Sequence, residues 1–486
     1  MAALAAEGLA IHQPPIKIIS GTTADEIDDH QIVKGLDGLE TACASVQELP
    51  KVGIIDDGDL SLAHKHSNAR DIGIEELQIQ ENEPEVPRLT KNLRQASCYI
   101  SLYISGYNCG VTGTLLPTIE KVYKLNYATV SLLFVSFCIG YLFSAFGSGR
   151  LIRRFGFGKV LTGAGVLMML GIIINCSQLV SFPLMCFAFL IVGTGFSTQL
   201  GLSNSYFATL PRPLLRMGVL HGLYGFGAFT SPLIATLFIS RDIRLNLFYL
   251  TSLGLIVPSI LVSYFAFVHG AARYNKLPDE IVVVVEDNAS TKRESLREII
   301  TRWEVWILSL FLLFYVGAEE SIGGWIVSYM TIVRHGDASG SAWVASGFYL
   351  GIAVGRVCLP FLNLIVGERL IVLIYILLAA GLQAVSWAVN SFMATAISTA
   401  LVGLTISTFY TAAIHTASKL LPRRMHTTAM TMMSSIGQSG SAIFPFVIGL
   451  ISNKKGIWTV QPAVVALLVG QFICWNLVPK VARRVE

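Results

Sequence analysis

The chain has 486 residues, of which 53% are hydrophobic and only 14% are charged, whereas soluble domains carry about 25% charged residues. Its net charge of +4 is the sum of an acidic and a basic region. Residues 1–87 hold 17 acidic and 5 basic side chains, while the remainder holds 14 acidic and 30 basic ones. Such asymmetry is typical of an acidic tail joined to a membrane or nucleic-acid partner. Repeated apolar runs of about 20 residues, enough to span ~30 Å of hydrocarbon, favour the lipid bilayer and exclude nucleic acid.

Residues 1–95 are polar and acidic, contain five prolines and lack sustained periodicity. We therefore expect a largely disordered tail. A basic segment followed by an apolar one is not found at the start of the sequence, so we expect no cleavable signal peptide and a cytosolic tail. Cytosolic regulators are possible partners of this tail, although no motif in it names one.

Twelve apolar segments follow the tail, and we predict that each is a membrane span. They cover residues 96–118, 127–149, 159–177, 181–208, 217–239, 245–268, 304–331, 341–364, 369–389, 391–414, 426–451 and 460–479. The charged segment 269–303 divides them into bundles 96–268 and 304–479, and a short tail, 480–486, ends the chain. We expect an all-α integral membrane protein with twelve transmembrane helices in two six-helix bundles and a cytosolic linker between the bundles.

The distribution of Lys and Arg predicts the orientation of these spans. Segments on the side of the N-terminal tail carry 22 basic residues, and segments on the opposite side carry 7. Basic residues accumulate on the cytosolic side of a membrane protein, so both termini are expected in the cytosol. We expect the plasma membrane rather than the vacuole or another endomembrane.

Short matching stretches recur in the two predicted bundles. "SGYNCGVTG" (105–113) in the first span aligns with "VGAEESIGG" (316–324) in the seventh, which sets Asn108 opposite Glu319. Weaker matches connect the second span with the eighth and the fifth with the eleventh. Three matches in the same order favour a transporter built from repeated bundles, whose binding site lies at the midplane of their interface.

Several of these stretches resemble the major facilitator superfamily. "GRLIRRFGFGK" (149–159) is similar to the family's signature between spans two and three. Gly149, Leu151, Arg154, Gly156 and Lys159 match this signature, Arg150 lies among them, and Arg153 stands at its acidic position. The resemblance implies two pseudo-symmetric six-helix bundles and a cytosolic latch at these residues, to which we add Arg356 of span eight. The arginine at position 153 removes the acid that the latch uses for its salt bridge.

"YVGAEESIGGWIVSY" (315–329) and "SGFYLGIAVGR" (346–356) resemble the fucose permease-like branch of the superfamily, as found in fungi. The sugar symporters of that branch use carboxylates in spans one and four for proton coupling. Here Gly113 and Leu200 stand at those positions, beside the retained Gln199 and Asn204. The mechanism implied by the branch therefore cannot be carried over unchanged.

Glu319 and Glu320 are the two acidic residues near the middle of a predicted span. A charge at the bilayer centre costs ~2.5–3.5 kcal/mol on insertion scales, so it usually faces the bundle interior or a wet cavity. Adjacent helical residues point about 100° apart. We expect Glu319, at the family's glutamate position, to face the cavity, and Glu320 to face a neighbouring helix or to be protonated.

Two roles remain open for Glu319. In the functional one, an apolar site raises the pKa of a carboxyl group, so Glu319 binds and releases a proton, and Glu319→Gln abolishes pH-dependent transport. In the structural one, Glu319 is neutral and hydrogen-bonded between helices, or is paired with Arg356. Arg356 itself is expected near the cytosolic end of its span, in the latch or snorkelling.

Other polar and aromatic side chains are candidates for lining the cavity. These are Asn108, Gln199, Asn204, Tyr224 and Gln438. Trp325, which follows two glycines, either stacks on a sugar ring or packs within the bundle.

The sequence contains no phosphate-binding loop and no HExxH or GxSxG motif, so it predicts neither an ATP-driven pump nor an enzyme. Its eight cysteines form no CxxC pair, and we expect no metal or other cofactor. We predict a secondary transporter of a small organic solute, sugar-like or a related polar metabolite, coupled to protons. The alternatives are an exporter of a small hydrophobic metabolite and a non-transporting membrane sensor or scaffold.

Overall fold

The computed structural model of the chain describes residues 87–479 except 178–180, 212, 270–297 and 423–424. Every described residue belongs to one unit of the chain, Pro84–Glu486. The predicted disordered tail, most of the predicted linker and the residues from 480 onward lie outside the described residues.

Helices account for nearly all of the first half of the described chain. They are α3 (Arg88–Tyr123), α4 (Tyr127–Val130), α5 (Leu132–Phe155), α6 (Phe157–Cys176), α7 (Phe182–Ala208), α8 (Pro213–Ile239), α9 (Leu245–Ser263) and the π-helical segment η1 (Tyr264–His269), which continues α9. The short α4 leads directly into α5, and its N-terminus is capped because Asn126 accepts a hydrogen bond from the Thr129 amide at 2.8 Å.

The second half repeats this organisation. Its helices are α13 (Trp303–Ile332), α14 (Ala338–Val366), α15 (Glu368–Ala388), α16 (Phe392–Ile406), α17 (Phe409–Leu420), α18 (His426–Lys455), the 3₁₀ turn η3 (Ile457–Thr459) and α19 (Val460–Leu477). The chain turns from α5 to α6 at Gly156 and from α14 to α15 at Gly367, with φ of +82° and +94°. Glycine adopts such values without steric cost, which explains the glycine at position 156 of the signature stretch.

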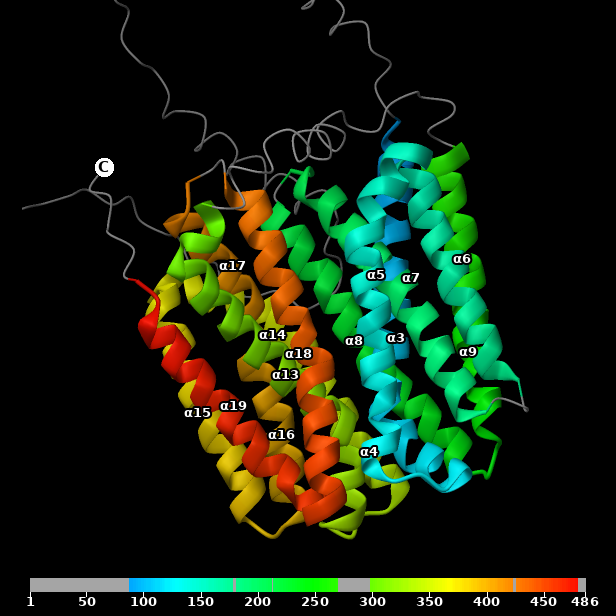
Figure 1. Cartoon of the computed structure of the whole chain (residues 1–486), viewed down its shortest axis with the longest axis vertical. Helices are drawn as coiled ribbons and strands as arrows, with labels where there is room; N and C mark the ends of the chain where they lie inside the picture. The colour runs from blue at the N-terminus through cyan, green and yellow to red at the C-terminus, as the bar shows by residue number, and fades with distance from the viewer. Residues whose placement is uncertain (1–86, 178–180, 212, 270–297, 423–424, 480–486) are drawn as a thin grey trace, which may run out of the picture. The chain divides into compact units, whose positions relative to one another are not determined.

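Each half packs mainly within itself, and the two halves are visible in Figure 1 as the blue-to-green and the yellow-green-to-red helices. In the first half α3 packs against α8 and α9, and α7 packs against α5 and α6. In the second half α13 packs against α18 and α19, and α16 packs against α14 and α15. Contacts between the halves are made by α8 with α14, by α3 with α13, and by α4 and α5 with α18.

Eleven helical segments of the described chain are long and apolar enough to cross a membrane. They coincide in order with the second to twelfth predicted spans, and α3 contains the predicted first span. α3 is less apolar and carries buried hydroxyl groups that face α9. The hydroxyl groups of Ser97 and Ser263 form a hydrogen bond of 2.7 Å, and those of Tyr107 and Thr251 form one of 2.8 Å. The prediction of an all-α integral membrane protein is confirmed.

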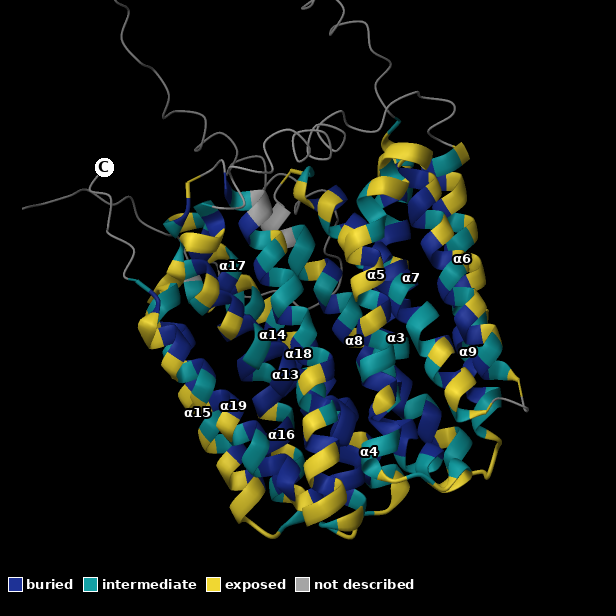
Figure 2. Ribbon diagram, in the orientation of Figure 1, coloured by how far each residue is buried: buried dark blue, intermediate teal, exposed yellow. Residues whose placement is uncertain are grey.

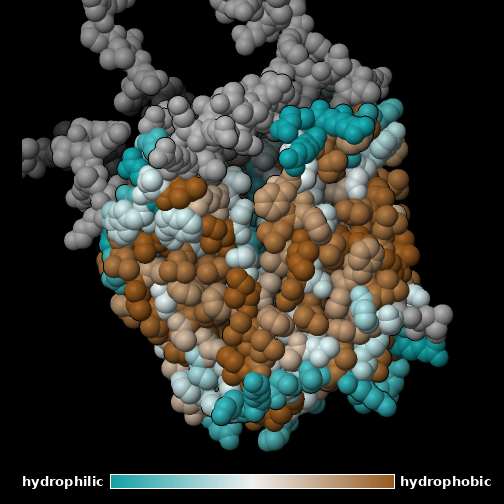
Figure 3. Space-filling model, viewed as in Figure 1, coloured by the Kyte–Doolittle hydropathy of each residue, from teal (hydrophilic) through white to brown (hydrophobic). Residues whose placement is uncertain are grey.

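The outer surface has the character expected for contact with lipid. Exposed side chains lie on the outward sides of helices such as α15 and α19, as Figure 2 shows. Many are large and apolar, including Phe146, Phe361 and Ile365. In Figure 3 hydrophobic residues form a broad belt, and hydrophilic residues gather toward the two ends of the helices. Such a belt can bury itself in hydrocarbon.

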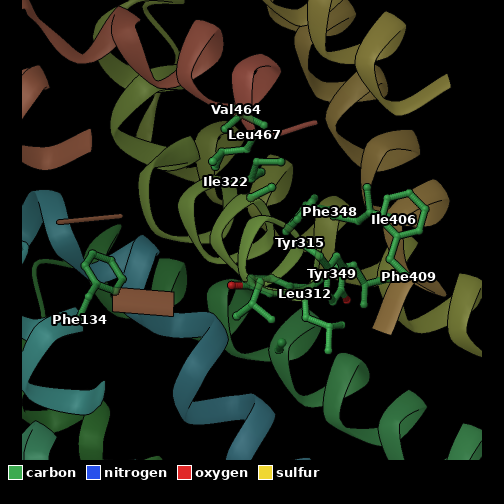
Figure 4. Packing of buried hydrophobic residues seen from close by; sticks show 14 of the residues in the cluster. Phe134, Leu312, Tyr315, Ile322, Phe348, Tyr349, Ile406, Phe409, Val464 and Leu467 are labelled. Atoms are coloured by element: carbon green, nitrogen blue, oxygen red, sulfur yellow. The ribbon is translucent and has the colours of Figure 1, made fainter. Parts of the chain in front are cut away.

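α13 lies at the centre of the second half. With 67% of its apolar stretch buried, it is the most buried of the candidate spans in the described chain. Figure 4 shows Tyr315 near Phe348, Tyr349 and Phe409, while Ile322 packs toward α19. The same helix carries Glu319 and Glu320, so its position brings two carboxylates into the protein interior.

Candidate functional site

Glu319 is paired with a base inside the second half. Its Oε1 lies 3.1 Å from Nη2 of Arg356, which is on α14, and its Oε2 lies 3.5 Å from the same nitrogen. Their side chains are 8% and 14% exposed. The arrangement is therefore a buried ion pair with charge-assisted hydrogen bonds, one of the structural alternatives left open by the sequence.

Aromatic side chains complete the surroundings of Arg356. Its Nη2 also donates to the Tyr315 hydroxyl at 3.3 Å, and Tyr315 precedes Glu319 by one turn of α13. On the other side, the guanidinium carbon lies 5.8 Å from the centre of the Tyr224 ring on α8, a cation–π distance. The sequence left open a latch position, snorkelling or pairing with Glu319 for Arg356; its guanidinium lies beside Glu319 and contacts both halves.

Glu320 points toward the first half. Its two carboxylate oxygens lie 3.8 and 3.9 Å from the thiol of Cys109 on α3. A thiol is only a weak hydrogen-bond donor. In the part of the chain that the structure describes, Glu320 has no basic partner within ion-pair distance. The two adjacent glutamates therefore have different environments, one neutralised by a cation and one not.

Two glycines bring α3 and α13 into backbone contact one turn beyond Cys109 and Glu320. A Cβ atom at Gly113 would lie 1.9 Å from the Gly323 carbonyl oxygen, and one at Gly323 would lie 2.1 Å from the Tyr349 hydroxyl. Neither position accepts a larger residue without movement of its neighbours. We call this contact between Gly113 and Gly323 the glycine crossing; it lies one turn beyond Glu320 along α13.

The side chains of the remaining predicted lining residues have no described contact with the two glutamates. Asn108 is beside Cys109 along α3, where its amide nitrogen donates to the Ile104 carbonyl of the same helix at 2.9 Å. None of the described hydrogen bonds, ion pairs or ring contacts connects Gln199, Asn204 or Gln438 to Glu319 or Glu320. Gln199 is buried and lies near Gly165 of α6, and the Asn204 side-chain oxygen is buried without a described partner.

Trp325 packs between the two halves. It is fully buried, and its indole N–H donates to the Pro445 carbonyl of α18 at 3.0 Å. Its ring lies 5.8 Å from that of Tyr127 and 6.1 Å from that of Phe134. These contacts match the packing alternative for Trp325 and leave none of its ring faces open in this conformation.

The signature stretch lies at the junction of α5 and α6. Arg150 donates to the Phe146 carbonyl of its own helix at 3.3 Å, and the Arg154 guanidinium lies 5.3 Å from the Phe155 ring centre. Among the described residues, Arg153 and Lys159 form no ion pair. This agrees with the absence of an acid from the stretch, because nothing there can make the expected salt bridge.

Three residues close to Glu319, Glu320 or Arg356 were not predicted from the sequence: Tyr315, Cys109 and Tyr349. The spacing of four residues between Tyr315 and Glu319 was a usable signal, because it places both side chains on one face of a helix. Cys109 and Tyr349 come from other helices, and no local pattern indicates their proximity to Glu320.

Comparison with known proteins gives one family match and several similar structures. A family model described as Major Facilitator Superfamily matches residues 98–445. The protein "Bypass of stop codon protein 6" of Saccharomyces cerevisiae is 28% identical over 416 residues, which cover 80% of this chain and 82% of the relative.

Two solved structures have similar folds. One is a bacterial homologue of the human lysosomal transporter Spinster in an inward-facing, unoccupied conformation; its TM-score is 0.64 at 13% identity, over 80% of this chain and 98% of that chain. The other is the fucose:proton symporter of E. coli, with a TM-score of 0.56 at 16% identity, over 79% of this chain and 98% of that one. At such identities the likeness shows the fold alone.

Proposed function

Because this chain belongs to the Major Facilitator Superfamily of secondary transporters, we propose that it moves a small polar organic solute, sugar-like or a related metabolite, across the bilayer together with protons. The chain is thus a multi-pass membrane transporter and not an enzyme. Alternating access, in which the two halves rock around a central site, is the proposed mechanism.

One observation carries the proton-coupled part of this proposal. A cluster of three ionisable side chains, Glu319, Glu320 and Arg356, lies within apolar helices where the two halves meet. Ionisable residues are expensive inside a membrane and usually mark a substrate or ion pathway. The proposed site therefore centres on this cluster, with Tyr224 and Asn108 beside it.

The chemistry of the cluster suits a solute that carries hydroxyl groups. Arg356 supplies donors and the carboxylates supply acceptors. A row of aromatic rings leads from the cluster into the first half. The ring centres of Tyr224 and Phe196 lie 6.1 Å apart, and those of Phe196 and Tyr141 lie 6.4 Å apart. A sugar ring presents hydroxyl groups at its edge and C–H groups on its faces, which match polar groups beside aromatic ones.

The same aromatic rings favour a second candidate, export of a small hydrophobic metabolite. Gly113 and Leu200 replace the acids used by the sugar symporters that this chain resembles. The neighbouring rings of Tyr141, Phe196 and Tyr224 supply apolar surface that suits a hydrophobic solute. The two candidates differ in the solute and in the direction of flux.

We extend the proposal to the topology. The excess of Lys and Arg on one side supports a cytosolic location for both termini and for the segment between the bundles 96–268 and 304–479. The plasma membrane is the proposed compartment. Gln199, Asn204 and Gln438 remain candidate lining residues for another stage of the transport cycle, and binding of regulators to the tail stays a prediction.

Reconstitution of the full chain into lipid vesicles tests this function. Flux of radiolabelled hexoses, deoxyhexoses, pentoses and small aromatic metabolites is measured with two values of internal and of external pH. We expect flux of one polar solute class above that of protein-free vesicles, accelerated by a proton gradient and slowed by a protonophore.

Two results would contradict the proposal. Flux restricted to the aromatic metabolites would favour the exporter, and flux indifferent to the proton gradient would remove proton coupling. The variant with both Glu319→Gln and Glu320→Gln is the matched control, because it keeps the size of both side chains and removes both carboxylates.

A further inference from the structure

We propose that Glu320, rather than Glu319, is the carboxylate that takes up and releases the transported proton. The sequence favoured Glu319 for this role. The inference rests on the proton coupling proposed above and adds an assignment within the cluster: the Glu319–Arg356 ion pair stays intact throughout the cycle, and Glu320 alternates between the ionised and the protonated form.

Glu319 is poorly placed to accept a proton. Arg356 holds its carboxylate at 3.1 Å, and both partners belong to the second half, so rocking of the halves does not separate them. Protonation of Glu319 would leave a buried guanidinium without its counterion, which is strongly unfavourable. The ion pair is therefore a fixed part of the second half.

Glu320 has the opposite environment. The titratable groups that face it are Glu319 on its own helix, Cys109 on α3, Tyr224 on α8, and Tyr349 and Arg356 on α14. Arg356 is the one cation among these groups, and it is paired with Glu319. A proton on Glu320 removes its repulsion by the Glu319 carboxylate and leaves no cation unpaired.

The position of Glu320 also couples its protonation to the rocking of the halves. Its contact with Cys109 crosses from the second half to the first, unlike the ion pair of Glu319. The glycine crossing lies one turn farther along both α3 and α13, so the two helices are in backbone contact on that side of Glu320 in this conformation. Separation of the halves there would break the contact with Cys109 and admit water from that side.

The proton step is simple in this arrangement. On one side of the membrane the Glu320 carboxylate takes a proton from hydronium: an O–H bond of hydronium breaks, a carboxyl O–H bond forms, and water is left. After the halves rock, the carboxyl O–H bond breaks and the proton passes to a water molecule on the other side, which becomes hydronium. The step needs no other reactant, because a single proton is gained and lost.

Infrared difference spectroscopy of the full chain in lipid tests proton binding without knowledge of the solute. The protein is titrated with acid, and the C=O stretch of protonated carboxyl groups is followed in the wild type, Glu320→Gln and Glu319→Gln. We expect Glu320→Gln to remove a titrating buried carboxyl signal that Glu319→Gln retains. Loss of that signal in Glu319→Gln, with retention in Glu320→Gln, would overturn the proposal.

Vesicle flux then connects this proton to transport. The readout is the ratio of flux with and without a proton gradient, measured with the solute of the panel that gives the fastest wild-type flux. We expect the ratio to fall to one in Glu320→Gln and to stay above one in Glu319→Gln, whatever their absolute rates. A wild-type ratio in Glu320→Gln would refute the assignment, whereas a ratio of one in the wild type would refute proton coupling itself.

Glu320→Asp provides a test that does not depend on the folding of Glu320→Gln. It keeps a carboxyl group but withdraws it by one methylene from Cys109, so the ratio should remain above one while the pH of its half-maximal value shifts. A pH dependence identical to that of the wild type would contradict a role for Glu320.

Discussion

The Glu319–Arg356 ion pair is the contact on which the proposed site depends at the scale of single residues. Its side chains are 8% and 14% exposed, and the Tyr315 hydroxyl accepts a further hydrogen bond from Arg356. Burial of two charges is costly, and their mutual attraction offsets that cost only while both are present. Loss of either partner therefore leaves a buried charge that destabilises the fold, even where the intact pair itself adds little net stability.

Arg356→Gln should therefore destabilise the protein more than removal of both charges. A buried partner left without its counterion typically costs about 3–5 kcal/mol. We expect a clear fall in the melting temperature of purified Arg356→Gln in detergent, and partial recovery in the double variant Glu319→Gln, Arg356→Gln.

Arg150→Gln is the matched control for this experiment. Arg150 is exposed, and its described hydrogen bond is to a backbone carbonyl of its own helix, so its melting temperature should equal that of the wild type. An Arg356→Gln variant as stable as the wild type, or a double variant no better than the single one, would contradict the buried pair.

At the scale of helices, the glycine crossing determines how closely the two halves approach. Gly113 of α3 leaves no space for a Cβ atom against the Gly323 carbonyl of α13, and Gly323 leaves none against the Tyr349 hydroxyl of α14. Small residues allow membrane helices to approach to backbone contact. Close contact on one side with separation on the other is the geometric requirement of alternating access, so the crossing should be a moving contact of the cycle.

Gly113→Ala should impair transport without preventing folding. Its Cβ would lie 1.9 Å from a backbone oxygen, so the halves must separate on that side and the closed arrangement becomes less populated. We expect monodisperse protein in detergent and at least a several-fold loss of solute flux in vesicles.

Gly201→Ala on α7 is the corresponding control, because no atom lies within 4 Å of the added Cβ, and it should transport like the wild type. Normal flux in Gly113→Ala would show that the crossing does not have to close.

The sequence predicted the helices well because each membrane span is an uninterrupted apolar run. The fourth span, expected over 181–208, is α7 over Phe182–Ala208, and the tenth, expected as one span, is divided into α16 and α17. The first was expected over 96–118, but α3 covers Arg88–Tyr123 because the helix continues into polar residues at both ends. Hydropathy marks the part of a helix that matches the hydrocarbon, not the point where its hydrogen bonding ends.

The site was harder to predict than the helices. Glu319, Glu320 and Arg356 stand out in the sequence because they are charged within apolar runs. Which glutamate meets Arg356 depends on the rotation of α13 against α14, and that is set by the packing of the whole half. The contact of Glu320 with Cys109 depends on the approach of two helices that are more than 200 residues apart in sequence.

At the scale of the whole transporter, the internal repeat lies at the place where the two halves meet. The stretches 105–113 and 316–324 match in sequence, and they also touch each other, at the contact of Cys109 with Glu320 and at the glycine crossing. Equivalent helices of the two halves thus form one interface. In the proposed mechanism, one rocking motion at this interface would change the access of water and the surroundings of the two carboxylates together.

Movement of protons with the solute tests this account most directly. A pH-sensitive dye is enclosed in vesicles that contain the full chain, and a gradient of the transported solute is imposed at equal internal and external pH. We predict a change of internal pH in wild-type vesicles and none in vesicles with the Glu319→Gln, Glu320→Gln variant. Solute flux in wild-type vesicles without any change of internal pH would contradict it.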